Sequence, residues 1–277
     1  MSVEKNFKVA LIQMKIIDDK KANLKKAEKL IREAAINKVD IVCLPEMFNC
    51  PYRPSKFKLF AEKEGEETLE MIKELAKENN IYIVAGSIPE KEDEKIYNTS
   101  YTVDNYGKVI GKYRKLHLFD VDIPGGVSIR ESDVFTPGDE VSVIETPFCK
   151  IGVCICYDLR FPEIFRIMES KGAKIIFIPA AFNKKTGKKH WETLIKSRAI
   201  DSQIYIAAVS PAYNRDERYE VYGHSKITDP YGNTMGELEE GEEILYGEIN
   251  LNRLEKIRSE FPVLKHRRMD IYEVVKK

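Results

Sequence analysis

Short apolar runs alternate along the chain with longer segments whose apolar residues recur every three or four positions. The short runs have the length and β-branched content of buried strands, and the longer segments have the spacing of amphipathic helices. Asn23 is expected to cap the first helix, and Asn105-Tyr106-Gly107 to form a hairpin turn. The first half is therefore predicted to be β-α-β-α-β-β-β, over residues 7–14, 23–36, 40–44, 68–79, 81–87, 98–104 and 109–113.

The second half of the chain repeats this order. Its predicted elements cover residues 150–156, 162–171, 174–179, 190–201 and 204–210, followed by a hairpin around Pro230-Tyr231-Gly232. The repeat extends to single residues, because Ser100, Asp104, Gly107 and Gly111 recur 125 positions later as Ser225, Asp229, Gly232 and Gly236. A strand at 243–250 and a short helix at 251–260 follow. A duplicated α/β unit is the simplest explanation.

Two copies of such a unit can bury their apolar sheet faces against each other and leave the helices outside. The sequence therefore predicts an α/β fold, a four-layer α-β-β-α sandwich of two mixed sheets with an internal pseudo-twofold repeat. The alternative is one doubly wound sheet. No linker interrupts the chain, so we expect a single domain over residues 1–277. Residues 251–277 form its C-terminal helix and tail, whose apolar and basic residues are expected to pack on the body or on a second subunit.

Composition narrows the classes of partner. The 277 residues are 43% hydrophobic, and Lys+Arg and Asp+Glu both number 45, so no basic field favours nucleic acid or an anionic membrane. No uncharged run approaches the roughly 18 residues of a membrane span, and the N-terminus lacks the pattern of a signal peptide. Five cysteines, an odd number, favour reduced thiols and a cytoplasmic location.

Cys156 stands where an apolar strand gives way to a polar turn, and Pro162 marks the start of the next helix. A thiol on such a turn faces backbone N–H groups and the positive end of the helix dipole, which favour the thiolate. Cys156 is therefore the predicted nucleophile. Cys43 and Cys154 lie inside apolar strands and are expected in the core, although Cys154 is the rival nucleophile. Cys50 is expected in an exposed loop.

Two charged residues also follow predicted strands. Glu46 comes directly after the strand at 40–44, and Lys115 follows the first hairpin. Since polar residues at strand ends meet at one edge of an α/β sheet, we expect both beside Cys156. A carboxylate can take the thiol proton, and an ammonium can stabilise the oxyanion, with the backbone N–H of Tyr157 as second donor. This set supports acyl transfer without a metal or cofactor.

The three residues and their contexts carry a resemblance. Leu44-Pro45-Glu46, the segment 113–119 around Lys115, and the segment 155–163 around Cys156 resemble the Glu-Lys-Cys triad of the nitrilase superfamily of carbon–nitrogen hydrolases, over nearly the whole chain. Further stretches resemble the omega-amidase branch of that superfamily, at residues 117–125, 131–132, 137–139 and 181–192.

This resemblance implies hydrolysis of the side-chain amide of 2-oxoglutaramate or 2-oxosuccinamate through a cysteine thioester. It implies that Glu131 is a second carboxylate near the lysine, and that the protein forms homodimers or larger assemblies with the tail crossing the subunit boundary. Alternatives are a deaminated glutathione amidase, which shares a tail like that at 262–268, a hydrolase of nitriles or N-carbamoyl amines, or a non-catalytic binding protein.

The remaining polar residues have competing interpretations. Arg160 can bind a substrate carboxylate or pair with Asp158 or Glu163, and we favour the structural pairing. His117 lies two residues from Lys115 and is also a candidate for substrate binding, as part of the pocket wall. The four histidines lack the spacing of a metal site, so no metal is expected. The lysines at 184–189 are expected in a solvated loop.

Overall fold

The structure, a computed structural model, describes residues 6–122 and 128–275. Its first sheet has seven strands within these ranges. They are, in spatial order, β15 (Glu243–Asn250), β1 (Asn6–Gln13), β2 (Ile41–Cys43), β3 (Tyr82–Val84), β5 (Lys95–Val103) and β4 (Ile88–Glu92), with β6 (Val109–Arg114) also paired to β5. β1, β2 and β3 are parallel and the other pairings are antiparallel, so the sheet is mixed.

The second sheet is also mixed. Its strands within the described part of the chain are, in spatial order, β14 (Thr234–Glu237), β13 (Lys226–Thr228), β12 (Tyr205–Val209), β11 (Ile175–Pro179), β10 (Lys150–Val153) and β9 (Val143–Glu145). β10, β11 and β12 are parallel, like β1, β2 and β3 in the first sheet. β7 (Asp120–Asp122) pairs with β8 (Ser128–Arg130) in a separate antiparallel sheet.

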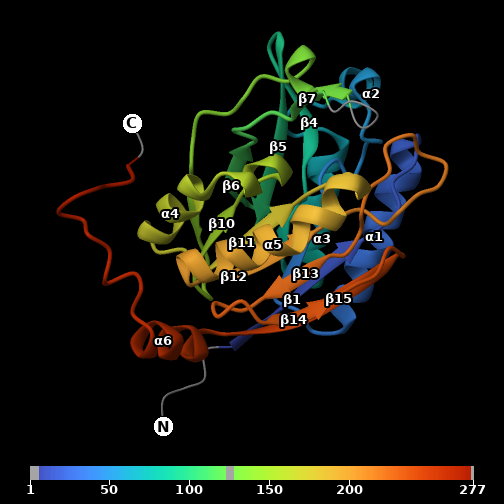
Figure 1. The fold of residues 1–277 in the computed structure, drawn as a ribbon. Coiled ribbons are helices and arrows are strands. Elements are labelled where there is room, and N and C mark those ends of the chain that lie inside the picture. The colour runs from blue at the N-terminus through green and yellow to red at the C-terminus, as the bar shows by residue number, and fades with distance from the viewer. Residues whose placement is uncertain (1–5, 123–127, 276–277) are drawn as a thin grey trace.

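Helices cover the outer face of each sheet (Figure 1). The described helices are α1 (Lys20–Ile36), α2 (Pro54–Phe60), α3 (Glu67–Asn79), α4 (Pro162–Ser170), α5 (Lys184–Ser202) and α6 (Leu251–Glu260), with short 3-10 turns η1 (Glu131–Asp133) and η2 (Cys156–Arg160). Buried residues of α1 and α3 share one core with the first sheet, and those of α4 and α5 pack on the second sheet.

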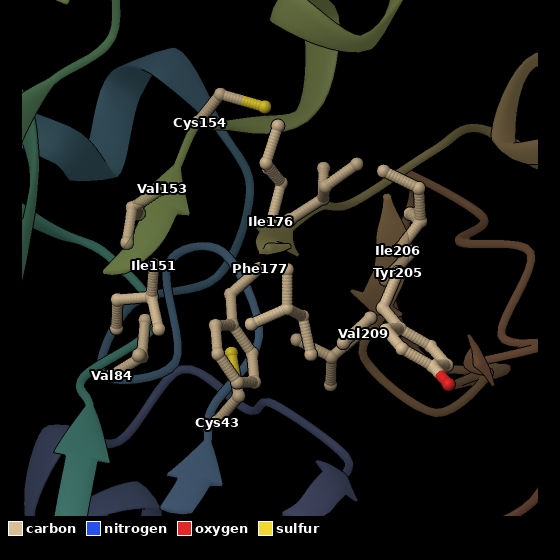
Figure 2. Close-up of a cluster of buried hydrophobic side chains, with 14 of the residues drawn as sticks. Cys43, Val84, Ile151, Val153, Cys154, Ile176, Phe177, Tyr205, Ile206 and Val209 are labelled. Carbon is tan, nitrogen blue, oxygen red and sulfur yellow. The ribbon is translucent and has the colours of Figure 1, made fainter. Parts of the chain in front are cut away.

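The inner faces of the two sheets form the central core. Along β1, Val9 and Leu11 join the core shared with the second sheet, whereas Ala10 and Ile12 join the core beneath α1 and α3. Figure 2 shows Cys43 of the first sheet beside Phe177 of the second. The four-layer α-β-β-α arrangement predicted from the duplicated pattern is confirmed.

The repeat is visible in the two hairpin turns. The side chains of Asp104 and Asp229 each accept backbone N–H groups from residues two and four positions later. Gly107 and Gly232 have φ values of 80° and 87°, a region that disfavours residues with a Cβ atom. The same chemistry therefore closes the equivalent turn in both halves.

The first helix begins earlier than predicted. Asp19 is its cap, because its side chain accepts the N–H of Ala22 at 3.0 Å. Asn23, the predicted cap, is instead a buried residue of α1 that donates to the Ile17 carbonyl at 2.7 Å. A helical residue with an amide side chain resembles a cap in sequence, so the pattern alone misplaced the boundary.

Two further boundaries differ from the prediction. α5 begins at Lys184 rather than at residue 190, so the segment 184–189 is helical and not a loop, with Asn183 as its cap. β10 ends at Val153, and Cys156 already belongs to η2. The short elements α2, β4, β7, β8 and β9 are additional to the predicted set.

The C-terminal segment after α6 runs outside both sheets (Figure 1). Large apolar side chains there are exposed, among them Phe261, Ile271 and Tyr272. Among the described residues, no helix is both long enough and apolar enough to cross a bilayer.

Candidate active site

Three side chains predicted from separate motifs come together at the carboxyl ends of strands. Glu46 follows β2, Lys115 follows β6, and Cys156 lies just beyond β10. All three are buried, with at most 5% exposure. Lys115 Nζ lies 2.9 Å from Glu46 Oε1, and a side-chain interaction between Glu46 and Cys156 completes the cluster.

The Lys115 ammonium lies between two carboxylates. Besides Glu46, it contacts both oxygens of Glu131, at 3.0 Å and 2.9 Å. Burial alone would lower the pKa of Lys115, but the charges of Glu131 and Glu46 outweigh it and raise this pKa well above its ordinary value. Lys115 is therefore a fixed positive charge inside the site.

Glu131 is itself held firmly. Its Oε1 accepts the hydroxyl of Tyr52 at 2.7 Å, and its Oε2 accepts the backbone N–H of Phe119 at 2.7 Å. The structure thus places Glu131 beside the lysine, where the resemblance expects it. The end of the omega-amidase-like segment, residues 123–125, lies outside the described residues.

Glu46 has one oxygen engaged and one free. Oε1 accepts from Lys115 and from Asn98 Nδ2 at 2.9 Å, whereas Oε2 has no hydrogen-bond partner of normal geometry among the described residues. Burial raises the pKa of Glu46, Lys115 opposes the rise, and Glu131 adds to it. Glu46 therefore offers an unoccupied basic oxygen on the side chain that interacts with the thiol.

Asn98 was absent from the sequence-based set. It lies opposite Lys115 in the first hairpin, where the Lys115 N–H donates to the Asn98 carbonyl at 2.9 Å. Counting back from the turn at residues 105–107 would have paired Asn98 with Arg114 instead, because the strand register shifts by one residue between Thr102 and Val103. An amide at an otherwise buried strand position was the available signal.

The environment of the Cys156 thiol favours its protonated form. Burial raises its pKa well above the ordinary value, and the Glu46 carboxylate raises it further. Lys115 and a hydrogen bond with the Ala181 backbone act in the opposite direction without reversing the shift. The turn was predicted to favour the thiolate, and burial of the thiol acts against that tendency, because loss of solvation opposes the effect of nearby dipoles.

A narrow pocket of about 20 Å³ adjoins Glu46, room for about one water molecule. Tyr52 and Tyr219 form part of its wall, with ring centroids 4.6 Å apart. Cys50 also lines it and is fully buried, so the predicted exposure of Cys50 is wrong. Neither tyrosine belongs to a recognisable motif, and only tertiary packing brings them here.

The other predicted residues lie around the nucleophile turn. His117 Nδ1 lies 2.7 Å from Asp158 Oδ1, and its ring stacks on Phe161. Tyr157 directly follows Cys156 in η2. Arg160 contacts His190 Nδ1 at 3.2 Å rather than Asp158 or Glu163, so the favoured structural pairing is wrong.

In chemical terms the cluster combines a nucleophile, a base and a fixed cation in a buried site. Such a set can transfer an acyl group from an amide to sulfur and then to water. Within residues 6–122 and 128–275, no group of three or more His, Cys, Asp or Glu side chains has the arrangement of a metal site.

Comparison with known proteins agrees with this geometry. A family model described as carbon-nitrogen hydrolase matches residues 8–259. Nitrilase homolog 2 of Dictyostelium discoideum is 44% identical over 273 residues, which is 98% of this chain and 83% of that protein. Omega-amidase NIT2 of Homo sapiens is 42% identical over 269 residues, covering 97% of this chain and 98% of that protein.

Among solved structures, Saccharomyces cerevisiae Nit3, a member of branch 10 of the nitrilase superfamily, superimposes with a TM-score of 0.87 at 39% identity. The match covers 95% of this chain and 97% of Nit3. The predicted resemblance is thus confirmed in both sequence and fold. This chain belongs to the carbon–nitrogen hydrolase family, within the nitrilase superfamily.

Proposed function

We propose that this carbon–nitrogen hydrolase is an omega-amidase, which hydrolyses the side-chain amide of a small 2-oxo dicarboxylic acid monoamide such as 2-oxoglutaramate or 2-oxosuccinamate. The observation that carries the chemistry is the buried cluster of Glu46, Lys115 and Cys156, with Glu46 Oε2 unoccupied. The names of relatives 42–44% identical over nearly the whole chain support the substrate class.

Acylation begins with transfer of the Cys156 proton to Glu46. The thiolate attacks the amide carbon, and the carbonyl oxygen becomes an oxyanion held by Lys115 and the backbone N–H of Tyr157. Glu46 then gives the proton to the nitrogen, the C–N bond breaks, and ammonia leaves a thioester on Cys156. Because one oxyanion donor typically contributes about 3 to 4 kcal/mol, the permanent charge of Lys115 accounts for a large share of the rate.

In deacylation water is the nucleophile and the Cys156 sulfur becomes the leaving group. Glu46 takes a proton from water, the resulting hydroxide attacks the thioester carbon, and the C–S bond breaks. The sulfur recovers the proton from Glu46, and the dicarboxylate is released. A thiol with a raised pKa is a poor resting nucleophile, so both steps depend on the base beside it.

Arg160 is the candidate partner for the substrate carboxylate. It follows the nucleophile by four residues, and no carboxylate lies within ion-pair distance of it in the described part of the structure. Its guanidinium lies 5.1 Å from the centroid of the Phe182 ring and 5.6 Å from that of Tyr157. A cation without an acidic partner near the turn suits an anionic substrate.

Hydrolysis of a panel of substrates tests the proposal, measured as release of ammonia or, for deaminated glutathione, as release of its dipeptide amine. The panel contains 2-oxoglutaramate, 2-oxosuccinamate, deaminated glutathione, a nitrile and an N-carbamoyl amine at equal concentrations, with Cys156→Ala as the blank. We expect kcat/KM for an omega-amide to exceed that for every other compound by at least about tenfold. Preference for a compound outside the omega-amides would refute the assignment.

We also propose that the protein is a cytoplasmic homodimer or larger homo-oligomer in which the C-terminal tail contacts a second subunit. Exposed Phe261, Ile271 and Tyr272 in that tail support the assembly. The cytoplasmic location is supported by the five cysteines, none of which forms a disulfide. They are Cys43, Cys50, Cys149, Cys154 and Cys156.

A further inference from the structure

Asp158 lies two residues after the nucleophile and is fully buried. Four donors converge on its carboxylate. Oδ1 accepts the backbone N–H of His117 at 3.0 Å and faces His117 Nδ1 at 2.7 Å, while Oδ2 accepts the Tyr113 hydroxyl at 2.7 Å and the backbone N–H of Ile155 at 3.0 Å. A carboxylate has room for about four hydrogen bonds, so these donors saturate it.

On one side, this carboxylate closes the turn that carries the thiol. Ile155 donates its N–H to Asp158 Oδ2, and Asp158 donates its own N–H to the Ile155 carbonyl at 3.0 Å. Cys156 lies between them with a φ of 49°, in the left-handed region that residues with a side chain rarely adopt. The paired hydrogen bonds hold Cys156 in this conformation.

On the other side, the Asp158 carboxylate binds the segment that carries Lys115. Tyr113 and His117 lie two residues before and two residues after Lys115, and both bind Asp158. The His117 ring also stacks on Phe161, at the end of the nucleophile turn, with centroids 3.6 Å apart. One buried group therefore joins the thiol turn to both flanks of the catalytic cation.

We propose that Asp158 is a positioning residue that fixes the Cys156 thiol relative to the Lys115 ammonium, and that His117 and Tyr113 act through it. His117, which the sequence suggested for the pocket wall, here acts through Asp158 instead. The kinetic part of this inference rests on the proposed amidase function. Reactions of this type are sensitive to small displacements of the reacting groups, so loss of the link reduces turnover more than binding.

Asp158→Asn is a sharp test because each carboxylate oxygen accepts one backbone N–H. Tyr113 and His117 can reorient a hydroxyl or change tautomer, but the N–H groups of Ile155 and His117 cannot. Whichever way the new amide faces, its NH₂ group meets a backbone donor. The substitution therefore disturbs the link at nearly constant volume.

Asp229→Asn is the matched control. Asp229 is also buried, and its Oδ1 accepts the backbone N–H groups of Tyr231 and Asn233 while its Oδ2 pairs with Arg253, but it lies in the hairpin turn of the second half and contributes nothing to the site. We expect both variants to lose stability. Only Asp158→Asn should lower kcat, by about tenfold or more with KM changed less than about threefold.

The rate at which iodoacetamide labels Cys156, followed by peptide mass analysis, measures the reactivity of the thiol without a substrate. We expect slower labelling in Asp158→Asn than in the wild type or Asp229→Asn at the same folded fraction. If the wild type hydrolyses no omega-amide, the substrate assignment fails while this comparison still decides the role of Asp158. Labelling and kcat in Asp158→Asn equal to those of Asp229→Asn would overturn the inference.

Two milder variants decide the matter if Asp158→Asn does not fold. Tyr113→Phe removes one hydroxyl, and His117→Phe keeps a ring to stack on Phe161. We expect each to lower kcat by about threefold to tenfold, and the double variant to lower it by less than the product, because both donors act on one carboxylate. Two folded variants with wild-type kcat, or a rise in KM alone, would contradict the positioning role.

Discussion

At the scale of single residues, the proposed chemistry depends on transfer of the Cys156 proton to the Glu46 carboxylate, which must be ionised to accept it. Burial raises the pKa of Glu46 above its ordinary value of 4.5. Activity should therefore fall as the pH decreases through a pKa higher than 4.5, because protonated Glu46 cannot accept the Cys156 proton. A profile of kcat/KM against pH measures this fall of activity on the acidic side. A midpoint at or below 4.5 would contradict the assignment of Glu46 as the base.

The same base and nucleophile should act as one unit. Glu46→Gln leaves Lys115 paired with Glu131, so we expect a folded protein whose kcat is reduced by at least about a thousandfold. Cys156→Ala should abolish turnover, and the double variant should be no worse than Cys156→Ala alone. Single-turnover ammonia release, with circular dichroism to check folding, measures this. Substantial turnover in Glu46→Gln would show that another group takes the thiol proton.

At the scale of secondary-structure elements, the hairpin turns are where local sequence dictates geometry. Gly107 has a φ of 80°, and a Cβ there would lie 2.8 Å from the Lys73 carbonyl oxygen. We expect Gly107→Ala to destabilise the protein by about 1 to 2 kcal/mol in urea unfolding. Gly241→Ala is the control, because nothing lies within 4 Å of its Cβ position. Equal effects of the two substitutions would refute the strain argument.

Periodicity predicted those elements whose residues alternate between a core and solvent. The strand at 243–250 and the helix at 251–260 agree with β15 and α6 to the residue. The first turns of α5 were missed because Lys184, Lys185 and Lys188 offer no apolar stripe. Strands of three residues, such as β7, β8 and β9, are too short for a period to emerge.

The same distinction applies to the site. Glu46, Lys115 and Cys156 were predictable because each follows a strand, and strand ends meet at one edge of a sheet. The partners that orient them come from packing. Asn98 and Tyr52 contact the cluster across 52 and 79 residues of sequence, and no local pattern encodes such contacts. The pKa of the thiol likewise follows from burial, which the sequence alone does not fix.

At the scale of the whole molecule, the duplicated halves leave one segment without a place in the sandwich. The tail beyond α6 exposes Met269, Ile271 and Tyr272, by 51% to 70%. If it contacts a second subunit, removal of residues 264–277 should shift the protein toward monomer in light scattering after size exclusion. Removal of only residues 273–277 is the control. An unchanged mass for the longer truncation would show that the tail does not hold the assembly.

The most direct measurement is the mass of the Cys156 peptide after rapid acid quench during turnover of 2-oxoglutaramate. The proposed mechanism predicts a species heavier by the substrate minus ammonia, located on Cys156 and absent from Cys156→Ala. Steady ammonia release with Cys156 unmodified at every quench time, or with the acyl group on another residue, would contradict it.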